Sequence, residues 1–382
     1  MSRRRTVWLM VSGSLLGTLV LAAAVLCFGT GCSSRGSSWG SALGYYAQAA
    51  GGHLDLMQRA RPVADAVADP ATPEPLRQRL QLSQRLRDFS VTELKLPDNS
   101  SYRRYADLQR DAVVWNVVAA PELGLALKTW CFPVMGCVGY RGYFKREDAD
   151  ALAARLKAEG WEVMVYGVPA YSTLGYSNWV GGDPLLNTFI RWSEAELARL
   201  LFHELAHQVV YVDDDTTFNE SFATALERVG TRRWLATHGA PQALAEVQAL
   251  ERRREDFAAL TQRYRERLRQ AYAGDGDDAA RRAHKAAVMA ELRLDYAQLK
   301  AGRWAGFAGY DGWFERANNA SFGVLAAYNE LVPGFENLLQ AEGGDPARFY
   351  EAVRTLARLP AAERRQRLTA VPPNPTPSQT PQ

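Results

Sequence analysis

The sequence predicts an α+β protein that is predominantly helical, with one small sheet early in the chain and a long helical hairpin later. Short runs rich in β-branched and aromatic residues fall between residues 112 and 175. Apolar residues at helical spacing occupy the chain on both sides of these runs. Two long, heavily charged helical patterns, 241–273 and 278–299, are joined by Gly274-Asp275-Gly276, which favours an antiparallel helical hairpin.

The first half of the chain should contain helices followed by the sheet. Residues 42–97 are predicted to be helical, with Leu82, Leu86 and Phe89 at i, i+4 and i+7 and a break at Pro70, Pro73 and Pro75. Strands are predicted at 112–119, 137–144 and 161–167, and a helix at 147–159. An extended segment at 169–175 leads into a Gly- and Asn-rich loop ending at Asp183-Pro184.

The second half is predicted to be wholly helical. Ser193 and Glu196 form a capping box that opens a helix running to about Tyr211, and a second helix spans roughly 219–238. After the hairpin come a loop at 306–312, helices at 314–331 and 335–359, and a disordered proline-rich tail at 371–382. Residues 42–370 are expected to form a single domain.

The charge balance bears on the class of partner. The chain has 45 basic and 42 acidic residues, and residues 1–31 contain Arg3, Arg4 and Arg5 and no acidic residue. The remainder is therefore formally neutral. Nucleic-acid binding requires a basic surplus that displaces counterions from phosphates, so no nucleic-acid partner is expected.

The N-terminal segment has the layout of an export signal. Three arginines precede the uncharged apolar run Thr6–Phe28, and Gly29-Thr30-Gly31-Cys32 follows. This resembles a bacterial lipoprotein signal, with residues 1–31 as the signal peptide, Cys32 as the lipidated residue and 32–41 as a flexible Gly/Ser-rich tether. Gly29 departs from that pattern, which usually has Leu there, and an uncleaved membrane anchor is the alternative.

Either interpretation places the rest of the chain in the bacterial envelope, facing the periplasm. Ser33 after Cys32 favours the outer membrane over the inner one, by resemblance. In this oxidising compartment Cys131 and Cys137 are expected to form a disulfide around a Pro/Gly turn. The alternative is a pair of metal-binding thiolates, but zinc sites of that kind have a second pair, and the sequence has none.

The chemistry is concentrated in His203-Glu204-Leu205-Ala206-His207. Residues four apart share one helical face, so His203 and His207 can bind one zinc ion, and Glu204 can act as general base on its bound water. The alternative is that these residues merely form the polar face of an amphipathic helix. The capping box, the scarcity of histidine (five in the chain) and a second helix close behind favour the metal site.

A catalytic zinc site needs a third protein ligand, and Glu220 in the first turn of the second helix is the candidate. The alternative is that Thr217–Glu220 is itself a capping box, in which Glu220 folds back onto the backbone. Glu227, two turns further along, could accept the free N–H of a zinc-bound histidine or could simply be an exposed helical residue.

His203–Gln208 followed by Asn219–Ala223 resembles the gluzincin metallopeptidases, in which both segments form one zinc site. The short gap between the two segments is more similar to a family of bacterial lipoproteins described as predicted zinc aminopeptidases than to the large cytosolic members. The resemblance to that family covers most of the body and is carried by these strings: Trp130–Pro133, Gly136-Cys137, Tyr140–Phe144, Ala170–Gly175, Asp183–Thr188 and Asn318–Ala320.

The resemblance implies a zincin-like catalytic core and hydrolysis of peptide bonds. Related peptidases stabilise the oxyanion with a Tyr or His away from the zinc helix, for which Tyr310 and Tyr328 are the candidates, although each could be a packing residue. They also bind the substrate backbone along an edge strand before the metal helix, the place in chain order of Tyr171, Ser172, Thr173, Leu174 and Gly175.

The function expected is therefore peptide hydrolysis with one Zn²⁺ ion, as an aminopeptidase held at the membrane by a lipid anchor. Two alternatives stay open. The substrate could be a peptidoglycan stem peptide or another envelope amide. The chain could also be a non-catalytic envelope lipoprotein that binds a partner through the hairpin 241–299, although the intact Glu204 favours catalysis.

Overall fold

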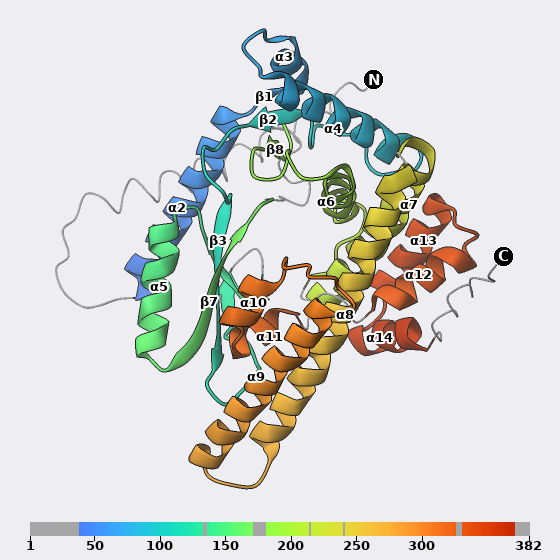
Figure 1. Cartoon of the computed structure of the whole chain (residues 1–382). Coiled ribbons are helices and arrows are strands. Elements are labelled where there is room, and N and C mark those ends of the chain that lie inside the picture. Colours follow the sequence, from blue (N-terminus) through green and yellow to red (C-terminus); the bar gives the residue numbers. More distant parts are fainter. Residues whose placement is uncertain are drawn as a thin grey trace, which may run out of the picture. The chain divides into compact units, whose positions relative to one another are not determined.

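The computed structural model describes residues 38–132, 136–170, 181–213, 215–239, 241–325 and 331–370. The chain separates into two compact units, Met1–Ala47 and Gln48–Gln382, and every element after the helix Ser38–Arg59 lies in the second. The helices are α2 (Ser38–Arg59), α3 (Val63–Ala68), α4 (Glu74–Thr92), α5 (Arg146–Ala158), α6 (Glu194–Ala206), α7 (Thr216–His238), α8 (Pro241–Ala273), α9 (Asp278–Ala301), α10 (Asp311–Arg316), α11 (Asn319–Leu325), α12 (Val332–Ala341), α13 (Pro346–Ala357) and α14 (Ala361–Thr369). The prediction of a predominantly helical α+β protein is confirmed (Figure 1).

The described strands form three small sheets. One has the order β1-β2-β8, one the order β6-β3-β7, and one pairs β4 with β5. Their bounds are β1 (Arg61–Pro62), β2 (Arg104–Ala106), β3 (Val114–Pro121), β4 (Trp130–Phe132), β5 (Gly136–Val138), β6 (Arg141–Tyr143), β7 (Trp161–Val168) and β8 (Leu185–Leu186). Only β2 and β8 are parallel, and the other pairs are antiparallel.

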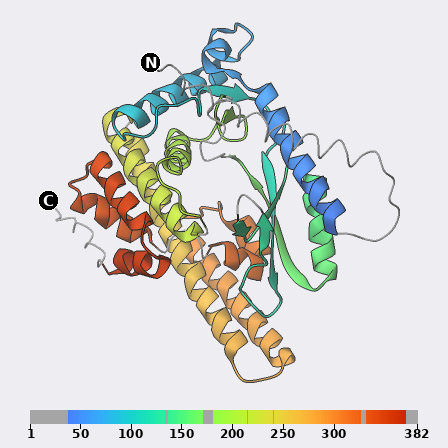
Figure 2. The same ribbon diagram turned by 180° about the vertical axis from the view of Figure 1, so that it is seen from behind.

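The longest strand pair, β3 with β7, is covered on both faces. Its register runs from Val114 opposite Val168 to Pro121 opposite Trp161. Helix α5 lies on one side of the pair and α11 on the other, as Figure 1 and, from behind, Figure 2 show. On the α11 side, Asn318 Nδ2 donates to the Val163 carbonyl at 3.1 Å. Among the described strands, β7 is an edge strand of its sheet.

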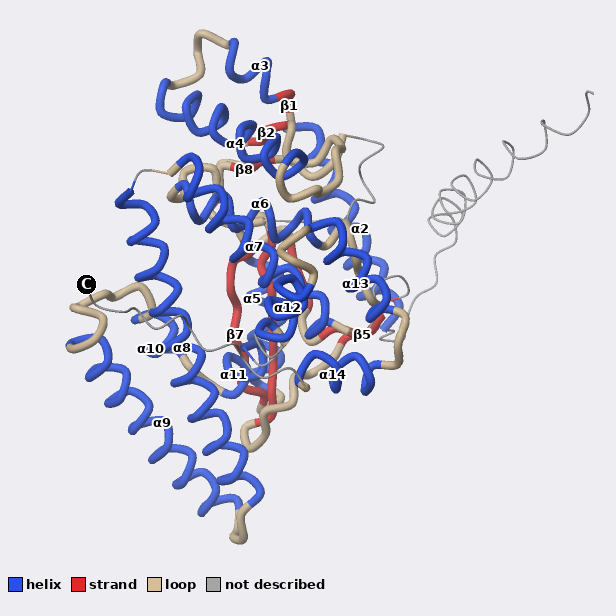
Figure 3. The backbone as a smooth tube through the Cα atoms, turned by 90° about the vertical axis from the view of Figure 1, so that its right-hand side faces the viewer, coloured by secondary structure: helices blue, strands red, loops and turns tan. Residues whose placement is uncertain are grey.

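The main hydrophobic core joins α4, α6, α7, α12 and α13. Its fully buried members include Leu86, Leu201, Phe222, Phe335 and Phe349. A second core lies between α8 and α9, which run side by side as the predicted antiparallel hairpin (Figure 3). Leu268 and Leu292 there are fully buried. The hairpin prediction is confirmed, and Asp277 caps α9 by accepting the Ala280 N–H at 2.8 Å.

Several predicted boundaries were wrong. The strands β1, β2 and β8 were missed because two or three residues are too short to show alternation. The predicted helix 314–331 is interrupted before α11, where the Asn318 side chain accepts the Ser321 N–H at 3.1 Å. The predicted helix 335–359 breaks at Gly343 and Gly344, whose positive φ angles of 67° and 72° end α12.

The predicted disulfide is present between Cys131 and Cys137, which are paired opposite each other in β4 and β5. Among the described residues, no helix is both long and apolar enough to cross a membrane. The apolar run Thr6–Phe28, Cys32 and the tail 371–382 lie outside the described residues.

Candidate metal centre

Helix α6 presents a polar face to α7. It begins where predicted, with Ser193 Oγ accepting the Glu196 N–H at 3.3 Å. Its apolar face is fully buried through Leu197, Leu201 and Leu205. Because residues four apart share a face, this burial turns Arg199, His203 and His207 together in another direction.

The end of α6 differs from the prediction. The helix stops at Ala206 rather than near Tyr211, so His207 is its C-cap residue and does not lie in mid-helix. The N–H groups of Gln208 and Val209 bond to carbonyls three residues back, at 3.1 and 2.9 Å, which tightens the last turn. The branched Val209 and Val210 then disfavour further helix.

Helix α7 begins at Thr216, earlier than predicted, and its N-cap is Asp215, whose side chain accepts the Phe218 N–H at 3.1 Å. Glu220 therefore lies in the second turn rather than the first. The alternative in which Thr217 caps the helix and Glu220 folds back onto the backbone is wrong, because Asp215 holds that position.

The connection from α6 to α7 is fixed by side chains. Asn219 Oδ1 accepts the Val212 N–H, and Asn219 Nδ2 donates to the Val212 carbonyl, both at 2.8 Å. The buried Arg364 of α14 pairs with Asp215 Oδ2 at 2.7 Å. These contacts satisfy buried backbone groups and set the place at which α7 starts. They thereby fix where Glu220 faces α6.

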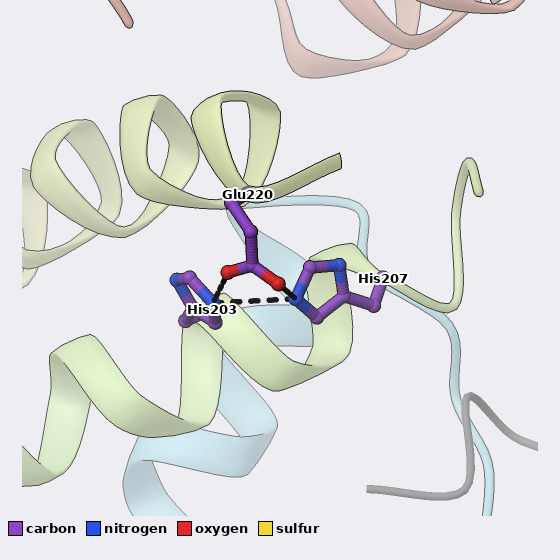
Figure 4. A group of neighbouring side chains, drawn as sticks. All are labelled: His203, His207 and Glu220. Atoms are coloured by element: carbon purple, nitrogen blue, oxygen red, sulfur yellow. Dashed lines mark hydrogen bonds and ion pairs between the residues drawn. The ribbon is translucent and has the colours of Figure 1, made fainter. Parts of the chain in front are cut away.

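The three predicted ligands converge (Figure 4). His203 Nε2 lies 3.2 Å from Glu220 Oε2 and 3.2 Å from His207 Nε2. His207 Nε2 lies 3.8 Å from the other Glu220 oxygen. One ligand atom from each residue falls within 4.8 Å of the others, so the group can hold a metal ion.

The donor set fits zinc. Two nitrogens bound to one tetrahedral zinc ion at about 2.05 Å would be separated by about 3.3 Å, close to the spacing of the two Nε2 atoms. Two histidines and one glutamate are also a donor set of catalytic zinc sites, which keep a fourth position for water. The Nδ1 atom of His207 is buried and has no hydrogen-bond partner among the described residues.

Glu227, paired with Arg199, contacts His203 at the ring nitrogen that does not face Glu220. Glu227 Oε2 lies 3.0 Å from His203 Nδ1, and the other Glu227 oxygen pairs with Arg199. A carboxylate at Nδ1 keeps the proton on that nitrogen and leaves Nε2 free to bind a cation. The alternative of an exposed Glu227 is wrong, because it is 9% exposed. Arg199 has no place in the motif, and its four-residue spacing to His203 is the only sequence signal for it.

Interactions within the protein shift the pKa values of the two imidazoles in opposite directions. Burial lowers the pKa of His203, but hydrogen bonds and charges from Glu220 and Glu227 outweigh it and raise that pKa well above its ordinary value. Burial and the charge of His203 lower the pKa of His207 to about 4. Burial raises the pKa of Glu220 and Glu227, but His203 and, for Glu227, Arg199 bring both below the usual range.

Glu204 lies between the two histidines and is half-buried. About one turn further along, Gln208 contacts the loop between α4 and β2. Asn99 Nδ2 donates to Gln208 Oε1 at 2.7 Å, and Gln208 Nε2 donates to Ser101 Oγ at 3.2 Å. This loop thus contacts the chain just after the end of α6, four residues beyond Glu204.

The other predicted site residues lie elsewhere or outside the described residues. The Tyr310 ring is stacked on Phe257 at 4.3 Å between centroids, within the aromatic cluster beside the hairpin. Tyr328, the segment Tyr171–Gly175 and Cys32 fall outside the described residues.

Tyr166, which belongs to no sequence motif, lies within electrostatic reach of Glu220. Tyr166 of β7 accepts a hydrogen bond from Asn116 Nδ2 at 3.4 Å, and burial, with the charge of Glu220 as a smaller cause, raises its pKa. Tyr166 and Asn116 are opposite each other in the register of β7 and β3. Their pairing is visible only once the strands are aligned, because fifty residues separate them in sequence.

Comparison with known proteins assigns the chain to a family. The family model described as Putative aminopeptidase matches residues 44–368. Searches of curated proteins and of solved structures found no match. The matched region contains the ligand residues, Glu204, Glu227 and the disulfide, and it spans most of the chain. This chain therefore belongs to the Putative aminopeptidase family.

Proposed function

We propose that the chain is a zinc-dependent peptidase with a zincin-like core, acting as an aminopeptidase on peptides in the bacterial envelope. The observation that carries the proposal is the convergence of His203, His207 and Glu220, with ligand atoms within 4.8 Å of one another. Glu204 in the same helix supplies the base that such a site needs for hydrolysis. The membership in an aminopeptidase family supports peptides as the substrate class.

Each residue of the proposed site has a distinct role in hydrolysis. A zinc ion held by the three ligands would lower the pKa of water and polarise the scissile carbonyl. Glu204 accepts a proton from the attacking water and returns it to the leaving amine. Glu227, held by Arg199, keeps the His203 ring oriented with Nε2 toward the ligand cluster.

The substrate backbone would bind along an exposed strand edge near the ligands. Strand β7 and the segment Tyr171–Gly175 that follows it are the candidates. Tyr166 of β7 joins Tyr310 and Tyr328 as a candidate donor to the oxyanion. Its support is its partly buried place on β7 within electrostatic reach of Glu220.

The proposed location rests on the N-terminal pattern. Three arginines, an uncharged apolar run and Cys32 are typical of a lipoprotein facing the periplasm, and Ser33 favours anchoring to the outer membrane. A Cys32→Ser chain should no longer incorporate labelled fatty acid. Unchanged acylation of that variant would sink the assignment of Cys32.

Metal analysis of the purified full-length chain tests the site. We expect one zinc per chain in the wild type and its loss in His203→Ala. Glu204→Gln should retain zinc but abolish cleavage of a defined mixture of synthetic peptides, read by mass spectrometry. Absence of bound zinc in the wild type, or full activity of Glu204→Gln, would contradict the proposal.

The exopeptidase assignment needs its own comparison. Each peptide in the mixture is supplied with a free and an N-acetylated terminus. An aminopeptidase releases single residues from the free form only, because it must bind the terminal amine. Equal cleavage of both forms would instead make the chain an endopeptidase.

A further inference from the structure

The chain between α4 and β2 holds a tyrosine in an unusual backbone conformation beside the Glu204 side of α6. Tyr102 has φ of 64°, in the left-handed region that costs a non-glycine residue free energy. Its side chain is 1% exposed. Such strain persists only where the surroundings determine it, and it is concentrated at functional sites.

The surroundings hold Tyr102 at several points. Its N–H donates to the Asp183 carbonyl at 2.6 Å, and its carbonyl accepts from Gln84 Nε2 at 3.0 Å. The preceding carbonyl, that of Ser101, accepts from the fully buried Arg87 at 3.1 Å. Ser101 Oγ in turn accepts from Gln208, about one turn beyond Glu204. The loop is therefore hydrogen-bonded to the chain four residues beyond Glu204, just after α6 ends.

The phenol itself has no such attachment. Tyr102 Oη is buried and has no hydrogen-bond partner among the described residues. By contrast, the hydroxyl of the buried Tyr350 is paired, because its Oη donates to the Leu94 carbonyl at 2.6 Å. A buried hydroxyl without a partner is costly, so its retention needs a reason outside folding.

The groups around the phenol suggest that reason. Burial, followed by the negative charges of Glu204 and Asp183, raises the pKa of Tyr102 well above its ordinary value. The hydroxyl thus stays protonated and can only donate to a carboxylate. A carboxylate has room for about four hydrogen bonds, so Glu204 can accept this one whatever else it contacts.

We propose that Tyr102 is a positioning residue for Glu204: its hydroxyl donates a hydrogen bond to the Glu204 carboxylate during hydrolysis and holds it in the orientation that accepts the water proton. This inference rests on the proposed function, because it needs Glu204 to act as the base. Catalytic hydrogen bonds that are long or unformed in a free enzyme commonly close when substrate binds.

Tyr102→Phe removes only the hydroxyl. A purely structural role would leave kcat unchanged, because the hydroxyl has no partner to lose. We expect kcat for the peptide cleaved fastest in the mixture to fall about tenfold or more. KM, bound zinc and the thermal midpoint should stay unchanged, or the midpoint should rise as an unsatisfied buried group disappears.

Tyr350→Phe is the matched control, because it removes a buried hydroxyl that does have a partner. It should show the reverse profile, a lower midpoint with unchanged kcat. Unchanged kcat in Tyr102→Phe would overturn the proposal. The proposal would also be overturned if the fall in kcat of Tyr102→Phe came with a loss of zinc, or with a thermal midpoint as low as that of Tyr350→Phe. Either result would show that the hydroxyl has a structural role.

A second readout needs no activity. Thermal midpoints of the wild type, Tyr102→Phe, Glu204→Gln and the double variant, each with zinc and a saturating peptide whose scissile amide is reduced and cannot be cleaved, form a cycle. If the phenol interacts with the carboxylate, Tyr102→Phe should change the thermal midpoint by different amounts in the wild type and in Glu204→Gln. We expect the two changes to differ by about 1 °C or more. Additive shifts would overturn the inference while leaving the zinc peptidase intact. Loss of the proposed function would show instead as a wild type without zinc or cleavage.

Discussion

Glu227 lies 3.0 Å from the Nδ1 atom of His203 and reaches it from α7, two turns beyond the proposed ligand Glu220. Its second oxygen pairs with Arg199, and the side chains of both residues are only 11% exposed. A buried carboxylate is costly unless it is paired, so Arg199 allows Glu227 to remain charged against the histidine. The set of side chains that supports the proposed metal site thus includes Arg199, one turn of α6 before the motif.

This relationship predicts the effect of Glu227→Gln. The amide can still accept a hydrogen bond from His203 Nδ1, but the negative charge that raises the basicity of the ring is lost. We expect the zinc affinity to fall about 10- to 100-fold, measured by competition with a chelating dye.

Asp295→Asn provides the control, because Asp295 is a carboxylate of the hairpin that accepts from Tyr264 Oη at 2.7 Å. Its zinc affinity should equal that of the wild type. An affinity of Glu227→Gln within twofold of the wild type would show that the carboxylate does not support the ligand.

Zinc stabilisation should depend on pH through His203. Because its pKa in the folded, zinc-free protein is raised, protonated His203 stabilises the fold below its unfolded pKa of about 6.5. That contribution is lost as the pH rises through the folded pKa. Zinc binding requires the neutral ring, so the affinity should rise about tenfold per pH unit while one proton is displaced.

The measurement is the rise in thermal midpoint caused by zinc, at pH 6 and at pH 8. We expect the larger rise at pH 8, and no rise at either pH in His203→Ala. A rise of equal size at both pH values would mean that no proton leaves the site when zinc binds.

The two-helix framework of the site could be predicted because its signals are local. Ser193 capping and the four-residue spacing of His203 and His207 each depend on one stretch of chain. The same holds for the hairpin of α8 and α9, where Asp277 caps the second helix. Only the bounds needed correction, because the last turn of α6 and the start of α7 depend on contacts with other segments.

The rest of the site could not be predicted because it depends on contacts between residues that are far apart in sequence. Ser101, next to Tyr102, is bonded to Gln208, which lies 107 residues later in sequence, and no periodicity encodes that contact. Tyr166 acquires its place only from the register of β7 against β3. The strands β1, β2 and β8 are held by tertiary contacts rather than by strand propensity, since each has two or three residues.

The start of α7 gives a test of how the third ligand is positioned. Asp215 caps this helix and pairs with Arg364, whereas Asp345 caps α13 by accepting from Ala347 and Arg348 N–H groups at 2.8 and 3.1 Å. Replacing either aspartate with Ala should cost about 1 kcal/mol of stability as a lost cap. Asp215→Ala should cost more, because it also leaves a buried Arg364 without its carboxylate.

Only Asp215→Ala should also affect the metal. The cap determines the residue at which α7 begins, and Glu220 lies five residues after it. We expect the zinc affinity of Asp215→Ala to fall about tenfold, and that of Asp345→Ala to match the wild type, in the same dye competition. Because both variants lose a helix cap, equal zinc affinities would show that Glu220 is positioned by the packing of α7 against α6 and not by its N-terminal connection.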